Sequence, residues 1–369
     1  MKLMEIGKYR VLMTGNEAIA RGAIAAGCKY FFGYPITPQS DIGEFLSAEL
    51  PKIGGAFVQS ESETASIYML YGGAMSGERV MTSTSGCGFA LMAEGISYIS
   101  AAEVPCVLVD VMRMGPGIGT GGQQGQTDYR YATSGPGHGG HRCIVLAPAS
   151  PQECFDLVQL AFYLADVYGI LAIVLSDFII GRMAEPVEIR TLDFGPVPEK
   201  EWALVGKGKK GGRTDRIFGG AHYPPRTLMS SIPDYHTHQR EKYQKIMATE
   251  VRYETYQTED AELLLASYGS SARVCRGAVE QGRAQGLRLG LFRPITVWPF
   301  PRKELKEVAA RVGKVLVVED SIGEFVDDVE FAVQGQVPVH LLGVWGRHMT
   351  GGSGIIHPER VLEEAKGLL

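Results

Sequence analysis

Closely paired cysteines are absent from this sequence of 369 residues. Its six cysteines are scattered, and no two of them form a C-x-x-C pair: Cys28, Cys87, Cys106, Cys143, Cys154 and Cys275. Structural zinc sites and iron–sulfur clusters take their ligands from such pairs or clusters, so neither has a ligand set within this chain. We therefore expect no metal site here, and free thiols in a reducing cytosol.

The sequence also has no apolar run of about 18 residues, the length that a membrane-spanning helix requires. Its first residues, Met1–Glu5, lack the long apolar core of a signal peptide. The net charge is only −5 and charged residues make up 21% of the chain, which gives no general attraction to nucleic acid or to an anionic membrane. We expect a cytoplasmic protein that binds neither.

Nucleotide-binding fingerprints are missing or weak. No phosphate loop of the G-x-x-x-x-G-K type occurs, and two matches to G-x-G-x-x-G begin at Gly117 and Gly135. The dinucleotide fingerprint needs a helix directly after it, whereas the first match runs into glutamines and the second into a predicted strand. We interpret both as glycine-rich loops, with a nucleotide-binding dehydrogenase as an alternative.

What the sequence does contain is a regular alternation of short apolar runs with helical patterns. Strands are predicted at 30–32, 56–58, 79–82, 104–112, 171–175, 262–266, 288–292, 314–318 and 337–342. Helices are predicted at 16–26, 39–50, 63–75, 89–102, 151–167, 237–248, 272–285 and 302–310. Such alternation predicts parallel sheets covered by helices on both faces.

We predict an α/β chain with two doubly wound parallel-sheet domains, 1–190 and 259–369. The segment 191–258 between them breaks the pattern and is predicted to be a linker or excursion. It contains a basic, glycine-rich run, 206–213, which we interpret as a solvated loop.

Candidate functional side chains follow three successive strands. The turn Gly33–Pro38 comes after the first, Glu63 opens a helix after the second, and Ser83–Gly88 ends the third. Parallel strands present their carboxyl ends at one edge of a sheet, so we expect these segments to border one pocket. By itself, Glu63 would be explained by the helix dipole, worth ~0.3–1 kcal/mol; its place beside a turn made rigid by two prolines favours a functional role.

Arg113 ends a very apolar strand, 106–112, and precedes a Gly-Pro-Gly run. An arginine at a strand end suits a bidentate grip on a substrate carboxylate. A salt bridge to a loop acid such as Asp128 explains it equally well, and the residues alone leave both interpretations open.

Four motifs together resemble the thiamine-pyrimidine-binding (α-type) subunit of 2-oxoacid:ferredoxin oxidoreductases, most closely the 2-oxoisovalerate (3-methyl-2-oxobutanoate) type. They match in order and spacing over nearly the whole chain: Gly33-Tyr34-Pro35-Ile36-Thr37-Pro38, Glu61-Ser62-Glu63, Leu291-Phe292-Arg293-Pro294-Ile295-Thr296-Val297-Trp298-Pro299-Phe300-Pro301 and Val318-Glu319-Asp320. The resemblance implies a thiamine diphosphate-binding fold of the pyrimidine type, followed by a transketolase C-terminal-like domain.

The resemblance also implies roles for site residues. Glu63 corresponds to the glutamate that activates the cofactor, Thr37 to the threonine near the substrate 2-oxo acid, and Arg113 to the arginine on its carboxylate. Three further residues at strand ends are candidates for cofactor contact: Ile36, Ser85 and Cys87. Cys87 can equally be an inert small apolar residue.

One absence limits what this chain does alone. It has no Gly-Asp-Gly run followed by asparagine, the pattern that holds magnesium and diphosphate in thiamine enzymes. The resemblance implies that a β-type subunit carries the Mg²⁺ and diphosphate half of the site. It implies further partners, a γ-type subunit and a ferredoxin-like iron–sulfur subunit with 4Fe–4S clusters, and a hetero-oligomer as the active form.

The implied reaction is CoA-dependent oxidative decarboxylation of a branched 2-oxo acid, 2-oxoisovalerate, to acyl-CoA and CO2 with reduction of ferredoxin. The nearest alternative is an α-type subunit acting on 2-oxoglutarate, whose second acidic group would call for another cation near the pocket. Alternatives from other classes are the nucleotide-binding dehydrogenase and a noncatalytic scaffold subunit.

Overall fold

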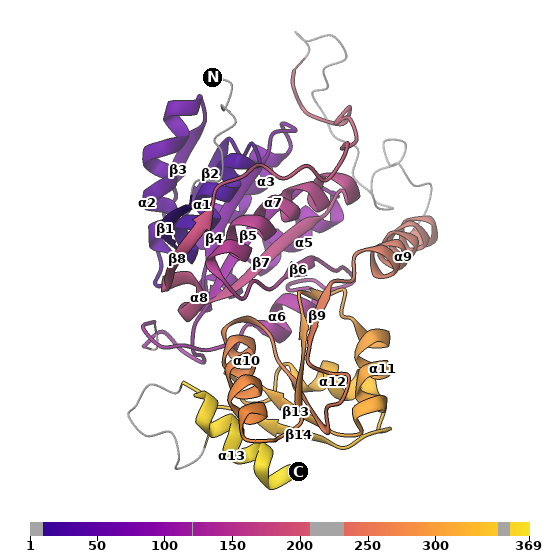
Figure 1. The fold of residues 1–369 in the computed structure, drawn as a ribbon. Coiled ribbons are helices and arrows are strands. Elements are labelled where there is room, and N and C mark those ends of the chain that lie inside the picture. Colours follow the sequence, from indigo (N-terminus) through magenta and orange to yellow (C-terminus); the bar gives the residue numbers. More distant parts are fainter. Residues whose placement is uncertain (1–9, 120, 207–231, 346–354) are drawn as a thin grey trace.

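The computed structural model of the chain describes residues 10–119, 121–206, 232–345 and 355–369. Within these ranges the strands form three sheets, and the two larger ones lie one above the other in Figure 1. The basic run 206–213, apart from Gly206, lies outside the described residues. No helix of the described part is long and apolar enough to cross a membrane.

The largest sheet is built mainly from the first half of the chain. Its strands are β2 (Tyr30–Gly33), β3 (Ala56–Gln59), β4 (Val80–Thr84), β5 (Cys106–Met112), β6 (Ile144–Leu146), β7 (Leu171–Asp177) and β12 (Thr296–Trp298). Their order in space is β12-β6-β7-β5-β4-β2-β3, and every pair is parallel except β12 with β6. Every residue of β4, β5 and β7 is buried, as expected for central strands covered on both faces.

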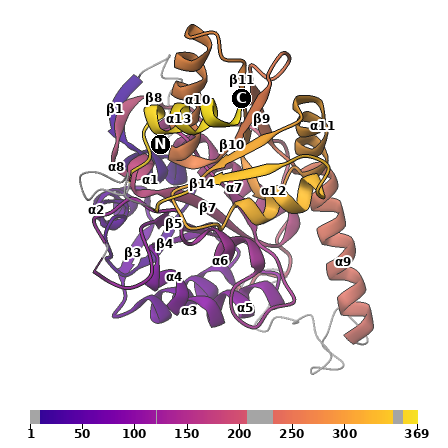
Figure 2. The same cartoon turned by 90° about the horizontal axis from the view of Figure 1, so that it is seen from below.

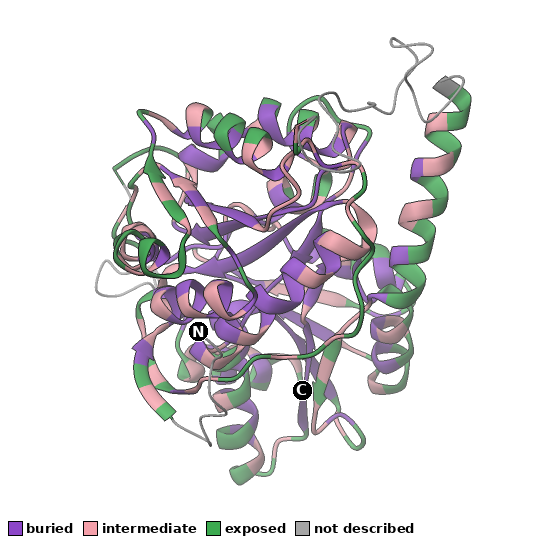
Figure 3. Ribbon diagram, turned by 90° about the horizontal axis from the view of Figure 1, so that it is seen from above, coloured by how far each residue is buried: buried purple, intermediate pink, exposed green. Residues whose placement is uncertain are grey.

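Helices cover both faces of this sheet. They are α1 (Gly15–Ala25), α2 (Ser40–Glu49), α3 (Glu63–Ala74), α4 (Cys87–Leu91), α5 (Ala93–Ala101), α6 (Tyr129–Ser134), α7 (Pro151–Tyr168) and α8 (Phe178–Arg182). Alternate residues of β5 belong to two cores: Val107 and Val109 share one with α1 and α7, whereas Leu108 and Met112 share the other with α3 and α5. Figure 3 shows the buried strands between these layers.

The second large sheet comes from the last third of the chain. Its strands are β9 (Tyr253–Tyr256), β10 (Leu263–Ala266), β11 (Leu289–Pro294), β13 (Val315–Val318) and β14 (Val339–Leu342). The order is β14-β13-β10-β11-β9, with only β9 antiparallel to its neighbour. The helices are α10 (Gly269–Ala284), α11 (Arg302–Val312), α12 (Val326–Val333) and α13 (Pro358–Leu368). α10 and α13 share a core on one face, while α11 and α12 join the core that reaches α3 and α5.

The remaining elements lie at the margins. β1 (Arg10–Thr14) pairs with β8 (Ala184–Glu188) in a small antiparallel sheet. The long helix α9 (Ile232–Thr249) lies at one side of the molecule in Figure 2. Two edge strands pair across the predicted boundary at residue 259. β9 lies before this residue but pairs in the second sheet, and β12 lies after it but pairs in the first. These two strands therefore do not follow the predicted domain limits.

Local sequence accounts for where the helices begin. The hydroxyls of Ser62 and Ser150 cap α3 and α7 by accepting from Ala65 N at 3.2 Å and Glu153 N at 3.1 Å. The single helix predicted over 89–102 is wrong, because the chain forms α4 and α5 with a break at Met92. There the Met92 amide donates to the Phe89 carbonyl three residues back, which tightens the turn.

Candidate active site

The candidate residues lie where four neighbouring parallel strands end. Gly33 at the end of β2 pairs with Gln59 at the end of β3, and Thr84 at the end of β4 pairs with Asp110 near the end of β5. The turn 34–38, the start of α3, the segment 85–88 and Arg113 follow these strands directly. The sheet thus brings together the segments that the sequence predicted to border one pocket.

Arg113 connects three of these segments. Its side chain is only 5% exposed, and its Nη1 donates to the Thr37 carbonyl at 2.8 Å. Its Nη2 donates to Cys87 Sγ at 3.1 Å. The described residues contain no ion pair between Arg113 and Asp128, the alternative that the sequence left open. Both acceptors are neutral groups, which leaves the guanidinium suited to bind an anion.

Glu63 is a buried carboxylate at the first turn of α3, with 5% of its surface exposed. Its side chain packs against the start of α4, because a Cβ placed on Gly88 would lie 2.6 Å from Glu63 Oε1. Among the described residues none forms a hydrogen bond or ion pair with this carboxylate. Neither Glu63 oxygen is among the enclosed unpaired atoms of the described part, so the carboxylate reaches the surface, where a ligand can contact it.

The other two candidates occupy different environments. Ser85 is fully buried and its Oγ has no hydrogen-bond partner among the described residues, as is also true of Thr84 Oγ1. Ile36 is half-buried in the turn between β2 and α2. No hydrogen bond of the described part links Ile36 or Ser85 to Arg113. The structure therefore joins Thr37, Cys87 and Arg113 by contacts and leaves Ile36 and Ser85 as neighbours in the same strand-end loops.

Two buried amides hold the proline-rich turn, and sequence reasoning did not single them out. Gln39 Nε2 donates to the Tyr34 carbonyl at 3.0 Å, and Ser83 Oγ donates to Gln39 Oε1 at 2.5 Å. Asn16 Nδ2 donates to the Pro38 carbonyl at 2.8 Å. The sequence did contain a sign of this role for Gln39. It directly follows the prolines, and a polar residue that precedes a helix often bonds to the preceding turn.

The loop after Arg113 returns on itself and is held at both ends. Met114 N donates to the Gln123 carbonyl at 3.1 Å, and Gly115 N donates to Thr127 Oγ1 at 3.0 Å. Thr127 Oγ1 in turn donates to the Arg113 carbonyl at 3.0 Å. The first G-x-G-x-x-G match lies in this irregular loop and the second precedes β6, so neither opens a helix in the described residues.

Buried amides of the same loop also bond to the unit formed by the second large sheet and its helices, which we call the second sheet's unit. Gln124 Nε2 donates to Ser270 Oγ at 2.9 Å and to Asp320 Oδ2 at 3.0 Å. Gln126 N donates to the Asp320 carbonyl at 2.8 Å. Burial raises the pKa of the Asp320 carboxyl to about 6. The element that carries Arg113 is therefore positioned partly by residues far away in the sequence.

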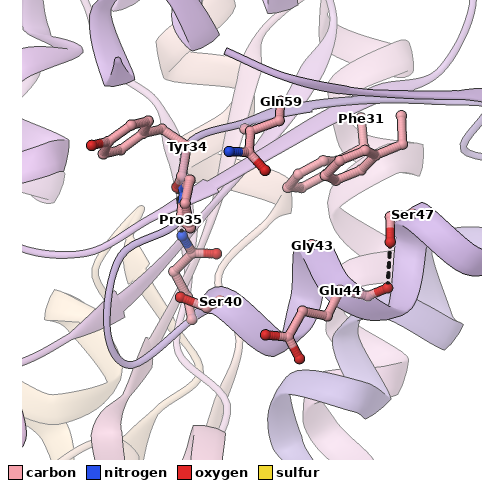
Figure 4. A pocket seen from close by; sticks show the side chains of 11 residues that line it. Phe31, Tyr34, Pro35, Ser40, Gly43, Glu44, Ser47 and Gln59 are labelled. Carbon is pink, nitrogen blue, oxygen red and sulfur yellow. Dashed lines mark hydrogen bonds between the residues drawn. The ribbon is translucent and has the colours of Figure 1, made fainter. Parts of the chain in front are cut away.

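A cavity of about 200 Å³ lies on the α2 side of the turn and does not contain the candidate catalytic residues. Figure 4 shows Phe31, Tyr34, Pro35, Glu44 and Gln59 around it. Glu63, Thr37 and Arg113 are not among its lining residues. This cavity is therefore separate from the candidate catalytic residues.

The residues present fit one part of thiamine diphosphate and not the other. The Glu63 carboxylate, which has no hydrogen bond among the described residues, suits the ring nitrogen of an aminopyrimidine, and the unpaired hydroxyls of Thr84 and Ser85 lie at the end of β4. The described residues include no group of three or more His, Cys, Asp or Glu side chains able to hold a metal ion. Glu63, with Ile36, Ser85 and Cys87 nearby in the loops, would hold the pyrimidine.

Two family models match this chain. One, described as pyruvate flavodoxin/ferredoxin oxidoreductase, thiamine diphosphate-binding, matches residues 21–257. The other, core domain II of pyruvate:ferredoxin oxidoreductase, matches residues 261–353. Together they span both large sheets.

Curated relatives cover most of the chain. Ketoisovalerate oxidoreductase subunit VorB from Methanothermobacter marburgensis is 42% identical over 328 residues, which is 87% of this chain and 89% of the relative. The 2-oxoglutarate synthase subunit KorA from Methanothermobacter thermautotrophicus is 37% identical over 370 residues, 95% of this chain and 96% of the relative. The two relatives are named for different substrates.

Two solved structures share the fold. The 2-oxoglutarate:ferredoxin oxidoreductase from Magnetococcus marinus, solved with 2-oxoglutarate, coenzyme A and succinyl-CoA bound, has a TM-score of 0.85 and 27% identity. That match covers 98% of this chain and 65% of the other, so the chain spans about two-thirds of that protein's length. A split-gene transketolase has a TM-score of 0.58 at 13% identity, which shows likeness of fold alone.

Proposed function

This chain belongs to the 2-oxoacid:ferredoxin oxidoreductases as an α-type subunit, and from that premise we propose that it supplies the aminopyrimidine half of a thiamine diphosphate site for oxidative decarboxylation of 2-oxoisovalerate. The assembled enzyme forms an acyl-CoA and CO2 and reduces ferredoxin. The observation that carries the proposal is the buried Glu63 carboxylate without a partner, beside the strand-end loops that hold Arg113 and Thr37.

When bound, thiamine diphosphate supplies the electron sink for decarboxylation. The task of this chain is to orient the cofactor and the substrate. The Glu63 carboxyl, on a residue only 5% exposed, would hydrogen-bond the pyrimidine ring of the bound cofactor and hold a proton there. Burial strengthens such a bond, because the local dielectric is low. Ile36, Ser85 and Cys87 complete the wall around the ring.

Arg113 binds the carboxylate of the 2-oxo acid, and Thr37 contacts the substrate beside it. The guanidinium is already fixed by the Thr37 carbonyl and Cys87 Sγ, so little of its side-chain freedom is left to lose on binding. Such pre-organisation would let this chain hold the substrate carboxylate in one orientation.

The substrate is proposed to carry one carboxylate. Arg113 is hydrogen-bonded to Thr37 and Cys87, and no second Lys or Arg side chain of the described part hydrogen-bonds to Thr37, Cys87 or Glu63. A second carboxylate, as in 2-oxoglutarate, would need such a cation. The 42% identity to the ketoisovalerate subunit, against 37% to the 2-oxoglutarate subunit, points the same way. 2-Oxoglutarate remains the second candidate because that relative matches more of the chain.

Partner chains supply what this one lacks. A β-type subunit carries the Mg²⁺ and diphosphate half of the site, and a γ-type subunit and a ferredoxin-like iron–sulfur subunit with 4Fe–4S clusters complete the complex. We propose that the β-type subunit docks on the face formed by α3, α4 and α5, which lie side by side in Figure 2. This face contains Glu63 and exposes large apolar side chains: Tyr68, Met69, Leu91 and Tyr98.

The decisive experiment is coexpression of the chain with its β-type, γ-type and iron–sulfur partners, followed by CoA-dependent dye reduction with a panel of 2-oxo acids. We expect 2-oxoisovalerate to give the highest kcat/KM and the isolated chain to be inactive and to bind thiamine diphosphate poorly. A preference for 2-oxoglutarate would establish the second candidate. Tight NAD(H) binding by the chain alone would instead favour a dehydrogenase.

Glu63→Gln tests the catalytic role within the same complex. The amide cannot exchange a proton with the pyrimidine, so we expect kcat/KM to fall by about 10²–10⁴-fold. Glu61→Gln is the matched control, because Glu61 is exposed and lies two residues away. Unchanged activity of the Glu63 variant would mean that the subunit is a scaffold.

A further inference from the structure

Two carboxyl groups lie behind the Arg113 loop, and the proposed chemistry does not use them. Asp110 belongs to β5 and is completely buried, and Asp128 directly precedes α6. Both oxygens of Asp110 and Oδ2 of Asp128 are enclosed and receive no hydrogen bond from the N–H and O–H donors of the described residues. The two side chains lie within reach of each other for a hydrogen bond. Two ionised carboxylates only accept, so this bond requires a shared proton.

The surroundings favour one proton on the pair. Burial, reinforced by the mutual contact, raises the pKa of Asp110 well above its ordinary value, and burial raises the pKa of Asp128 to about 6. The charged groups that face the pair are Arg113, which favours ionisation, and Glu324, which opposes it. Asp110's partners in the sheet, Thr84 on β4 and Leu175 on β7, carry no charge. The pair therefore holds a single negative charge over the pH range in which Asp128 has ionised and Asp110 has not.

The pair contacts both segments that hold the candidate site. The backbone of Gly86, in the loop between β4 and α4, lies near both carboxyl groups. Gly86 also packs on Arg113, since a Cβ there would lie 3.3 Å from Arg113 Nε. Asp128 follows Thr127, whose hydroxyl bonds to the Arg113 carbonyl. Asp110 lies just before the loop that starts at Arg113, and Asp128 lies where this loop ends, so their contact brings the two ends of the loop together near Arg113.

We propose that Asp110 and Asp128 are positioning residues that share one proton and thereby hold Arg113 and the Gly86 backbone in place for the substrate carboxylate. The inference rests on the proposed function in one respect, namely that Arg113 binds the substrate carboxylate; the shared proton does not depend on it. Loss of the shared proton leaves two negative charges in contact, which repel each other and spread the loop ends. It also adds a negative charge beside Arg113, which competes with the substrate.

The shared proton is tested on the isolated chain by urea unfolding across a pH series. In the unfolded chain both aspartates ionise near their ordinary pKa of about 4, whereas the folded chain retains protons above that pH. The stability contributed by the pair is therefore lost as pH rises through the folded pKa values. Asp110→Asn and Asp128→Asn each replace the shared proton by an amide N–H that does not titrate. We expect each variant to gain stability relative to the wild type as pH rises from about 5 to about 9.

Glu330→Gln is the matched control, because it makes the same change at an exposed carboxylate on α12. Its stability difference from the wild type should not vary with pH. If one of the two aspartate variants does not fold, the other is enough for the test, since an amide at either position donates a hydrogen bond to the remaining carboxylate. A difference that stays constant with pH in both aspartate variants would overturn the shared proton.

The positioning role is tested in the assembled complex by the pH profile of KM for the 2-oxo acid. In the wild type we expect KM to rise about tenfold as the pair loses its proton, because one added charge acts on Arg113 at close range. In Asp110→Asn, which leaves only Asp128 to titrate, the site keeps one charge above a pH of about 6, so KM should stay within about twofold above that pH while kcat changes little. A variant profile that follows the wild type would overturn the role. If the complex turns over no 2-oxo acid and the stability difference still varies with pH, the proposed function fails and the shared proton stands.

Discussion

Gly88 is the residue on which the position of Glu63 depends most directly. A Cβ at this place would come within 2.6 Å of Glu63 Oε1 and would also meet Thr84 Oγ1. Gly88→Ala should therefore displace the carboxylate without changing any charge. A displacement of about 1 Å at a catalytic group costs on the order of 10²-fold, so we expect kcat/KM of the assembled enzyme to fall by about that factor.

The matched control is Gly277→Ala in α10, where a Cβ meets only Pro358, no closer than an ordinary 3.6 Å. Alanine there should leave kcat/KM unchanged and raise the stability of the helix by ~0.5–1 kcal/mol. Steady-state kinetics and urea unfolding of both variants make the comparison. Full activity of Gly88→Ala would mean that Glu63 does not need its present position.

Single residues at strand ends could be predicted from the sequence because parallel strands fix where they end. Thr37, Cys87 and Arg113 follow three different strands, and the structure joins them by hydrogen bonds. Their roles in binding and catalysis stay predictions. Asp110 could not be singled out, because within an apolar strand its significance depends on Asp128, which only the fold brings near.

At the scale of elements, the helices α3, α4 and α5 form the face that we propose for the β-type partner. Leu91, the last residue of α4, is 56% exposed there. Leu91→Glu should lower the affinity for the partner by about tenfold or more, because it places a charge in the apolar centre of an interface. The stability of the isolated chain should change by less than about 0.5 kcal/mol, since the side chain is at the surface.

Met247→Glu provides the comparison, because Met247 is 46% exposed on α9, which is not one of the three helices of this face. Copurification and analytical ultracentrifugation of each variant with the β-type chain would measure assembly. Equal loss of assembly in both variants would contradict the proposed docking face.

Elements with strong local signals could be predicted from the sequence, and those made by distant pairing could not. α3 and α7 begin at serine caps, and the residues of β5 and β7 are almost all apolar. By contrast, β1 pairs with β8 although the two strands lie at opposite ends of the first 190 residues. β12 is only three residues long, too short to show a pattern of its own. Such short edge strands form because a partner edge is available, which no local pattern reveals.

At the scale of the whole molecule, the second sheet's unit holds the loop of the first that carries Arg113. Gln126 is the centre of this contact and is fully buried. Its Nε2 donates to the Tyr268 carbonyl at 3.1 Å, and its Oε1 accepts from Ser271 Oγ and Asp320 N, each at 3.0 Å. The two-unit α/β architecture was predictable from alternation of strands and helices, whereas this contact depends on how the units meet.

Gln126→Ala should therefore affect both stability and substrate binding. It leaves the Tyr268 carbonyl, the Asp320 amide and the Ser271 hydroxyl without this partner, and we expect a loss of about 2–4 kcal/mol in the free energy of unfolding. The loop should also hold Arg113 less firmly, which raises KM for the 2-oxo acid. Gln159→Ala is the matched control, because Gln159 is equally buried and bonds to the Phe155 and Arg190 carbonyls within the first unit alone. It should lose comparable stability at unchanged KM. If the two variants show the same KM in the assembled enzyme, the second unit does not position the Arg113 loop.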